Sequence, residues 1–209
     1  MLKSKFRSRS WLVAAAMVAL VAPGLAHAQL SDSYTFLKAV READGAKVME
    51  FLNRPSSNIV NTRDSGNGDT ALIIATNRRD TEWISFLIGK GANPNLANSS
   101  GVTPLMVAAQ LRYIEGTQIL LKAGAQVDKT DRSGVTALMR AVQLRDLPII
   151  RLLVAHGANP DKRDLTGTSA RDYAQQDPRG PAMLEGLKDA KPAQPSRPAP
   201  TGPVAGPVF

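Results

Sequence analysis

The stretch Gly101-Val102-Thr103-Pro104-Leu105-Met106-Val107-Ala108 decides the fold, because the chain repeats its pattern every 33 residues. Gly68-Asp69-Thr70-Ala71-Leu72 stands one interval before it, and Gly134-Val135-Thr136-Ala137-Leu138 stands one interval after it. Three further columns keep the same interval: Gly91, Gly124 and Gly157; Leu87, Leu120 and Leu153; and Ala75, Ala108, Ala141 and Ala174. A unit this short cannot bury its own apolar face. The pattern therefore predicts a solenoid in which neighbouring units stack to form one continuous core.

Each unit is expected to contain two short helices. The Thr-x-Leu-x-x-Ala segment opens the first helix, and an apolar run such as Ile119-Leu120-Leu121 forms the second, which ends at Gly124. Glycine suits this helix end because it adopts a left-handed conformation without a Cβ clash. The alanine column is predicted where helices of adjacent units approach most closely, since larger side chains there would overpack the stack.

These motifs resemble the ankyrin repeat, in three consecutive full units. The joints Gly91-Ala92-Asn93-Pro94-Asn95, Gly124-Ala125-Gln126-Val127-Asp128 and Gly157-Ala158-Asn159-Pro160-Asp161 are similar to the family's turn, and Asn98, Asp131 and Asp164 follow them in the loops. The resemblance implies an all-α ankyrin-repeat solenoid of helix-turn-helix units joined by hairpin-like loops. Two columns depart from the family: Ile73, Met106 and Met139 replace its histidine, and Arg79, Arg112 and Arg145 replace the glycine that ends its first helix.

The resulting domain prediction has three parts. Residues 1–28 form a signal peptide, residues 29–188 the ankyrin repeat domain, and residues 189–209 a disordered proline-rich tail. Within the domain, a degenerate repeat with extra loop residues covers about 33–67, full repeats cover 68–100, 101–133 and 134–166, and a C-terminal cap covers 167–188. Irregular end repeats are expected, because each presents one face to water.

The N-terminus has the three parts of a secretory signal. Four basic residues precede an apolar run over 11–22, and Ala26-His27-Ala28 offers a small-residue cleavage site. The alternative is an uncleaved anchor, but 12 apolar residues fall short of the about 20 that a membrane-spanning helix needs. We expect cleavage after Ala28, no stable membrane insertion afterwards, and a periplasmic or secreted protein of a bacterium. The chain has no cysteine, which excludes a cysteine-linked lipid and disulfides.

Charge and composition weigh against nucleic acid as a partner. Removing the four basic residues of the leader lowers Lys plus Arg from 26 to 22 against 18 acidic residues, so the net charge falls from +8 to +4. The remaining basic residues are mixed with acids, and aromatics such as Trp83 and Phe86 are expected in the core. This is not the basic stripe with stacking rings that single-strand binders use.

The sequence gives no sign of catalytic, metal or cofactor chemistry. His156 is the one histidine left after cleavage, and its place before Gly157 at a helix end is typical of a surface residue. Without cysteine, neither a His/Cys metal cluster nor a cysteine nucleophile is possible. Asp128, Asp131 and Asp161 belong to the repeated turns and lack the spacing of a calcium loop. We therefore predict no enzyme, no catalytic residues, no metal and no cofactor.

Residues that folding does not require are the candidates for binding. By resemblance, the concave face is lined by the loop tips and the last turn of each first helix. The predicted protein-binding residues are Asn77, Arg78, Val102, Gln110, Leu111, Arg112, Arg132, Val135, Gln143, Leu144 and Arg145, with Gln176 continuing the amide column and Ser99, Ser100 and Ser133 at the tips. One interpretation is a solvated face whose arginines pair with Asp80, Glu115 and Asp146. The other is a groove that holds a partner segment with apolar anchors and acidic flanks.

The predicted function is an exported interaction module that binds a protein or peptide on its concave face. Two alternatives stay open: a structural or assembly protein of the cell envelope without a dedicated ligand, and a small-molecule binder or weak enzyme, which a deep polar pocket would favour. The tail carries Pro-x-x-Pro spacings and the terminal Val208-Phe209, which we interpret as a solvated spacer, with docking as the alternative.

Overall fold

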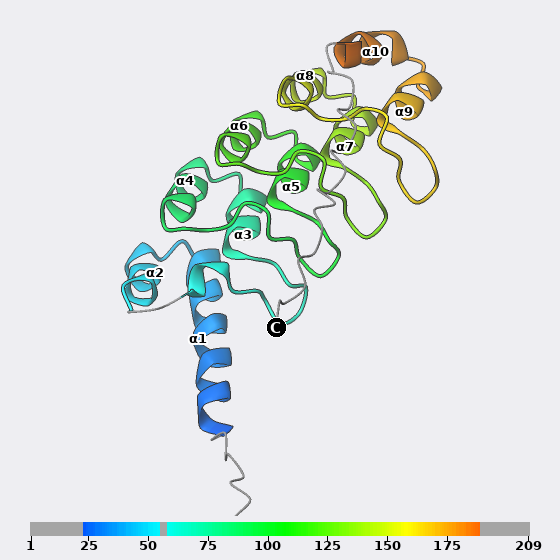
Figure 1. Ribbon diagram of the computed structural model, residues 1–209. Coiled ribbons are helices and arrows are strands. Elements are labelled where there is room, and N and C mark those ends of the chain that lie inside the picture. Colours follow the sequence, from blue (N-terminus) through cyan, green and yellow to red (C-terminus); the bar gives the residue numbers. More distant parts are fainter. Residues whose placement is uncertain (1–22, 55–57, 189–209) are drawn as a thin grey trace, which may run out of the picture.

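The computed structural model describes residues 23–54 and 58–188, which form a curved stack of helix pairs with loops projecting from one side (Figure 1). An inner row consists of α1 (Pro23–Arg41), α3 (Ala71–Asn77), α5 (Pro104–Gln110), α7 (Ala137–Gln143) and α9 (Ala170–Gln176). An outer row consists of α2 (Gly45–Leu52), α4 (Thr81–Gly89), α6 (Ile114–Lys122), α8 (Leu147–Ala155) and α10 (Gly180–Lys188), and a 3-10 turn, η1, covers Ile59–Asn61. No strand occurs in these two ranges, so the predicted all-α solenoid is confirmed.

A buried hydroxyl starts each inner helix after α1. Thr103 and Thr136 cap α5 and α7: each side-chain oxygen accepts a hydrogen bond from the backbone N–H three residues on, at 3.3 and 3.2 Å. Thr70 and Ser169 do the same for α3 and α9. The methionines that replace the family's histidine complete this cap, because the sulfur atoms of Met106 and Met139 accept from the cap N–H at 3.5 and 3.4 Å.

The predicted alanine column lies at the centre of the inner row. Ala75, Ala108, Ala141 and Ala174 have no exposed surface, and α3, α5, α7 and α9 pack against one another along this line. Leu72, Leu105 and Leu138 are equally buried beside them. The core is therefore continuous from unit to unit, as the repeat interval predicts.

The glycine column ends the outer helices as expected. Gly91, Gly124 and Gly157 follow the last helical residues of α4, α6 and α8 with φ of +88°, +83° and +86°. This is the left-handed region, in which a Cβ is strained.

The loops stack on one another through backbone bonds. Arg132 N–H donates to Ser100 O at 3.0 Å, and Leu165 N–H donates to Ser133 O at 2.9 Å. Within each loop a short polar side chain holds the turn: Asp131 Oδ1 accepts from Ser133 N–H at 2.8 Å and from Val135 N–H at 3.0 Å. Asn98 and Asp164 accept two backbone N–H groups in the same way, so the turn role expected of this column is confirmed.

The first unit carries the extra residues predicted for it. Ala39 and Ala75 are equivalent buried positions but stand 36 residues apart instead of 33, and residues 55–57 of the intervening loop lie outside the described part. At the other end, α10 packs against α8 and buries the side chains of Met183 and Leu187.

The two terminal predictions lie largely outside the described residues. The signal peptide was predicted over 1–28, and only its last residues, from Pro23, are described, as the start of α1. Among residues 32–41 of α1, for which burial is described, Phe36, Leu37, Ala39 and Val40 are buried. The tail 189–209 is not described. Within the two described ranges, no helix combines the length and apolarity that crossing a membrane requires.

Candidate protein-binding surface

The arginine column occupies the turn between the two helices of each unit. Arg79, Arg112 and Arg145 have φ of +56°, +54° and +58°, the left-handed conformation for which the family uses glycine. A side chain in this conformation costs roughly 1–2 kcal/mol per residue. Arginine therefore needs a compensating contact here.

That contact is a hydrogen bond to the next unit. Arg79 donates to the carbonyl oxygen of Leu111, and Arg112 Nη2 donates to that of Leu144 at 2.6 Å. Arg145 Nε donates to the Asp177 carboxylate at 2.7 Å. We call these three bonds the arginine ladder. Each joins the turn of one unit to the equivalent turn of the next.

The ladder differs from the pairing assumed in one of the two interpretations of the sequence, in which the arginines pair with Asp80, Glu115 and Asp146. Glu115 and Asp146 do not receive the arginines assigned to them, and Asp80 is bound at 2.8 Å by Arg78 instead of Arg79. Those acids were assigned because they lie within a few residues of the arginines in the sequence, in the same repeat unit. A left-handed residue instead directs its side chain across the gap to the next unit.

An exposed amide column runs beside the ladder. Asn77, Gln110, Gln143 and Gln176 are the last residues of α3, α5, α7 and α9, and all four are exposed. Gln110 Oε1 accepts from Arg140 Nη1 at 3.3 Å. Repetition at the same helix end brings the predicted amides into one row along the inner face.

The apolar and charged residues predicted to bind a partner are more buried, or more engaged in hydrogen bonds, than the amides. Val102, Val135 and Leu111 are half-buried and pack against the core, and Leu144 is half-buried as well. Arg78 donates to the carbonyl oxygens of Val40 and Arg41 in addition to Asp80. Arg132 is exposed at a loop tip. Arg112 and Arg145 are also exposed, but their side chains form hydrogen bonds of the ladder.

The amide column ends in a polar hollow of about 370 Å³ between α7 and α9. It is lined by Val142, Gln143, Arg145, Tyr173, Gln176, Asp177 and Pro178. The backbone N–H of Arg179 and the Arg145 guanidinium lower the pKa of Asp177, so its carboxylate is charged at neutral pH. Two residues predicted separately, Gln143 and Arg145, thus share one hollow that offers amides, a phenol and an ion pair.

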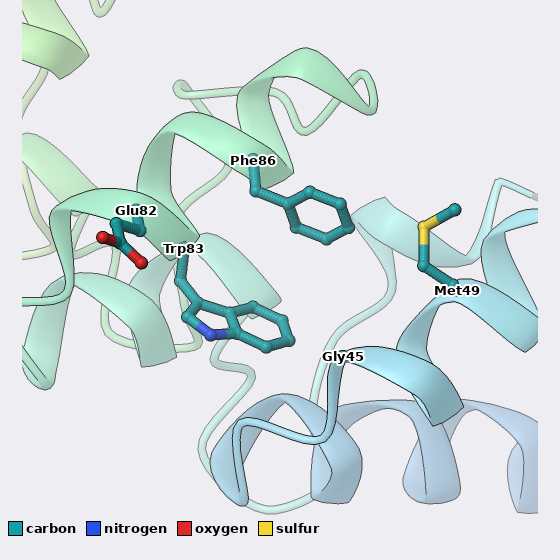
Figure 2. Close-up of a pocket in the computed structure, with 5 residues that line it drawn as sticks. All are labelled: Gly45, Met49, Glu82, Trp83 and Phe86. Atoms are coloured by element: carbon teal, nitrogen blue, oxygen red, sulfur yellow. The ribbon is translucent and has the colours of Figure 1, made fainter.

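A second hollow of about 370 Å³ lies on the outer row, where Gly45 and Met49 of α2 face Glu82, Trp83 and Phe86 of α4 (Figure 2). We call it the aromatic groove. The sequence prediction placed both rings in the core, but Trp83 and Phe86 are only half-buried. A comparison between units could have found them, since the equivalent positions hold Gly116 and Ile119 in one unit and Ile149 and Leu152 in the next.

Two further observations on the described residues concern a metal site and a catalytic role of the histidine. In the described part of the chain, no three His, Cys, Asp or Glu side chains are grouped so as to hold a metal ion. His156 is exposed at the end of α8, and its Nδ1 lies 2.8 Å from the carbonyl oxygen of Leu152.

Comparison with known protein families agrees with this arrangement. A family model described as ankyrin repeats in three copies matches residues 36–131, and a single ankyrin repeat model matches residues 133–165. A search of curated proteins finds no significant match. Ankyrin repeats are generally protein–protein interaction modules and are typically not enzymes. The chain belongs to the ankyrin repeat family, as these two matches, the stacked helix pairs and the 33-residue units show.

Proposed function

We propose that this protein is an exported ankyrin-repeat module that binds a partner protein or peptide on its inner, concave face. The observation that carries the proposal is the exposed amide column, Asn77, Gln110, Gln143 and Gln176, which folding does not use as a core or a cap. An amide both donates and accepts, so a row of amides can pair with the backbone of an extended segment.

The polar hollow and the loop tips supply the rest of the surface. Tyr173, Arg145 and Asp177 lie at the end of the amide column, and Arg132 stands exposed at a tip. The ladder keeps the turns in fixed positions. A rigid surface of this kind loses little conformational entropy on binding.

The first test locates the contact. A photo-crosslinking residue at position 143 should capture the partner in intact cells, while the same residue at Gln118, an exposed amide on the outer helix α6, should not. Equal capture from both positions would contradict binding by the inner face.

The second test measures affinity for the captured protein. The double variant Gln110→Ala, Gln143→Ala removes two hydrogen-bonding groups worth about 0.5–1.5 kcal/mol each, so the affinity should fall by about fivefold to about a hundredfold. Gln118→Ala with Gln175→Ala is the matched control, because both amides are exposed and lie outside the column. A structural protein without a dedicated ligand would give no specific capture at position 143.

Export is proposed from the leader. Cleavage after Ala28 would remove the apolar run and leave α1 from Gln29 to Arg41, which retains the buried residues described for this helix, Phe36, Leu37, Ala39 and Val40. N-terminal sequencing should find Gln29 first in the soluble envelope fraction, and replacing Ala26 and Ala28 with Leu should block processing. Full-length chain recovered from the cytoplasm of unmodified cells would refute the proposal.

A further inference from the structure

The aromatic groove lies on the outer row, away from the amide column, and its rings are held in place. Trp83 and Phe86 meet edge to face, with their centroids 5.5 Å apart and an interplanar angle of 75°. Arg78, bound to Asp80, lies 5.4 Å from the centre of the Trp83 ring, and Lys90 lies 5.8 Å from that of Phe86. Figure 2 shows both rings directed from α4 towards α2, where Met49 stands opposite.

Repeat folding does not account for the two rings. The same positions hold Gly116 and Ile119 in α6 and Ile149 and Leu152 in α8, and both helices pack well there. At position 116 the ring of Tyr113 fills the space instead, since a Cβ would lie only 2.4 Å from it. Aromatic side chains at positions 83 and 86 are therefore a property of this unit alone, at the place where α2 and α4 leave a hollow of about 370 Å³.

We propose that the aromatic groove binds the chain's own proline-rich segment, residues 189–209. Six prolines occur in these 21 residues, at positions 192, 195, 198, 200, 203 and 207. Proline-rich segments favour the polyproline II conformation, and grooves lined by aromatic rings bind it because the segment has little conformational entropy to lose. The inference is independent of the function proposed for the inner face.

Charge supports this occupant. Glu82 lies exposed at the edge of the groove, and Arg197, directly before Pro198, is the basic residue of the segment that comes within reach of it. An acid beside aromatic rings suits a proline-rich ligand with basic residues between its prolines. A basic side chain can pair with Glu82 while the prolines pack on the rings.

The segment is long enough to reach the groove. α10 lies three helices from α4 along the outer row, through α8 and α6, and helices pack about 8–10 Å apart, so the distance is about 30 Å. A polyproline II segment advances about 3.1 Å per residue, which gives about 65 Å for these residues. Residues from about 198 onwards can therefore lie in the groove.

Attachment to the same chain favours this occupant over a free ligand. A short linker holds a ligand at an effective concentration in the millimolar range, so even weak affinity gives substantial occupancy. A second copy or a separate proline-rich protein would have to reach that concentration in solution.

Trp83 itself reports on the groove. The chain has two tryptophans, so in a Trp11→Phe chain Trp83 is the single tryptophan and its emission can be excited selectively over that of the three tyrosines. Acrylamide quenching of that full chain is compared with the variant that also carries Pro195→Ala, Pro198→Ala, Pro200→Ala and Pro203→Ala, which keeps length and charge. If the tail covers the ring about half of the time, the quenching constant should rise about twofold in the proline variant.

Two further measurements identify the occupant. A synthetic peptide of residues 189–209 should restore shielding when added to the proline variant at millimolar concentration, and Met49→Gln, on the far wall, should weaken that effect. In the chain with its prolines intact, shielding should not depend on protein concentration. Equal quenching of the two chains would overturn the proposal, as would shielding that grows with protein concentration, which would assign the groove to a second copy. Shielding that persists in the proline variant but disappears when residues 11–22 are removed would assign it to the leader.

Discussion

At the residue scale, the arginines of the turns reverse the usual preference for glycine. In most ankyrin repeats glycine ends the first helix, and the sequence alone suggested that Arg79, Arg112 and Arg145 were surface residues with acidic neighbours. The structure shows that each accepts a strained φ and gains a hydrogen bond to the next unit. Strain and bond act at the same residue, so a pair of substitutions can separate them.

Arg112→Ala should lower the free energy of unfolding by about 0.5–1.5 kcal/mol, because it removes the bond to Leu144 O and keeps the strained conformation. Arg112→Gly removes the same bond and relieves the strain, so it should be more stable than Arg112→Ala by about 1 kcal/mol. Urea unfolding of both variants measures the difference.

The control is Arg151, an exposed residue inside α8. There the order should invert, with Arg151→Gly less stable than Arg151→Ala by about 1 kcal/mol, because glycine weakens a helix interior. The same order at both positions would show that strain at Arg112 is negligible.

At the element scale, the close packing of the inner helices depends on the alanine column. Ala108→Leu adds three carbons to a position without exposed surface and should destabilise the protein by about 1–3 kcal/mol through overpacking. Gln143→Leu, at an exposed helix end, should change the free energy of unfolding little. Similar shifts in the unfolding midpoint for the two variants would mean that Ala108 is not at the point of closest approach.

In the loop before α9, the carboxyl group of Asp164 makes the free energy of unfolding depend on pH in the acid range. The Thr166 hydroxyl, with help from the Tyr173 hydroxyl and two backbone N–H groups, lowers the pKa of Asp164 from 3.8 to about 2 against the effect of burial. As the pH falls from about 4 towards 2, the unfolded chain binds a proton at this carboxyl that the folded chain does not, so stability is lost in that window.

Asp164→Asn should reduce this acid dependence, because asparagine keeps the turn, as Asn98 does in an earlier loop. The measurement is the urea midpoint of both proteins between about pH 6 and pH 2. Lowered pKa values at Asp64, Asp172 and Asp177 leave part of the acid loss in place. Parallel curves for the two proteins would assign the acid loss to those other carboxyls.

At the scale of the whole molecule, the interval of 33 residues was enough to predict the all-α ankyrin-repeat solenoid. A residue type that recurs at the same position of every unit, such as alanine from Ala75 to Ala174, indicates a structural role that all units share. The amide column was predictable for the same reason: it occupies one helix end in every unit. The partners of Arg112 and Arg145 were not, because they lie in the following unit and depend on a backbone direction that spacing along the chain does not contain.

The aromatic groove escaped prediction for the opposite reason. Trp83 and Phe86 occur in one unit alone and follow the helical spacing of buried residues, which made them core candidates. Their half-exposure arises from the hollow between α2 and α4, a property of how two units meet. Residues that differ between units at equivalent positions therefore point to surface features of single units, which the repeated pattern does not reveal.

The arginine ladder also determines how this protein could change length. Its first two bonds end on backbone carbonyl oxygens, which every residue possesses, whereas the last ends on the carboxylate of Asp177. A duplicated copy of residues 101–133 inserted after the original would supply both an arginine and an acceptor carbonyl, and the row of bonds would gain one member without any compensating substitution. Growth after α9 has no such freedom, because Asp177 and Pro178 offer no arginine to continue the series. The ladder can therefore lengthen by internal duplication, whereas Pro178, at the position equivalent to Arg145, cannot extend it beyond Asp177.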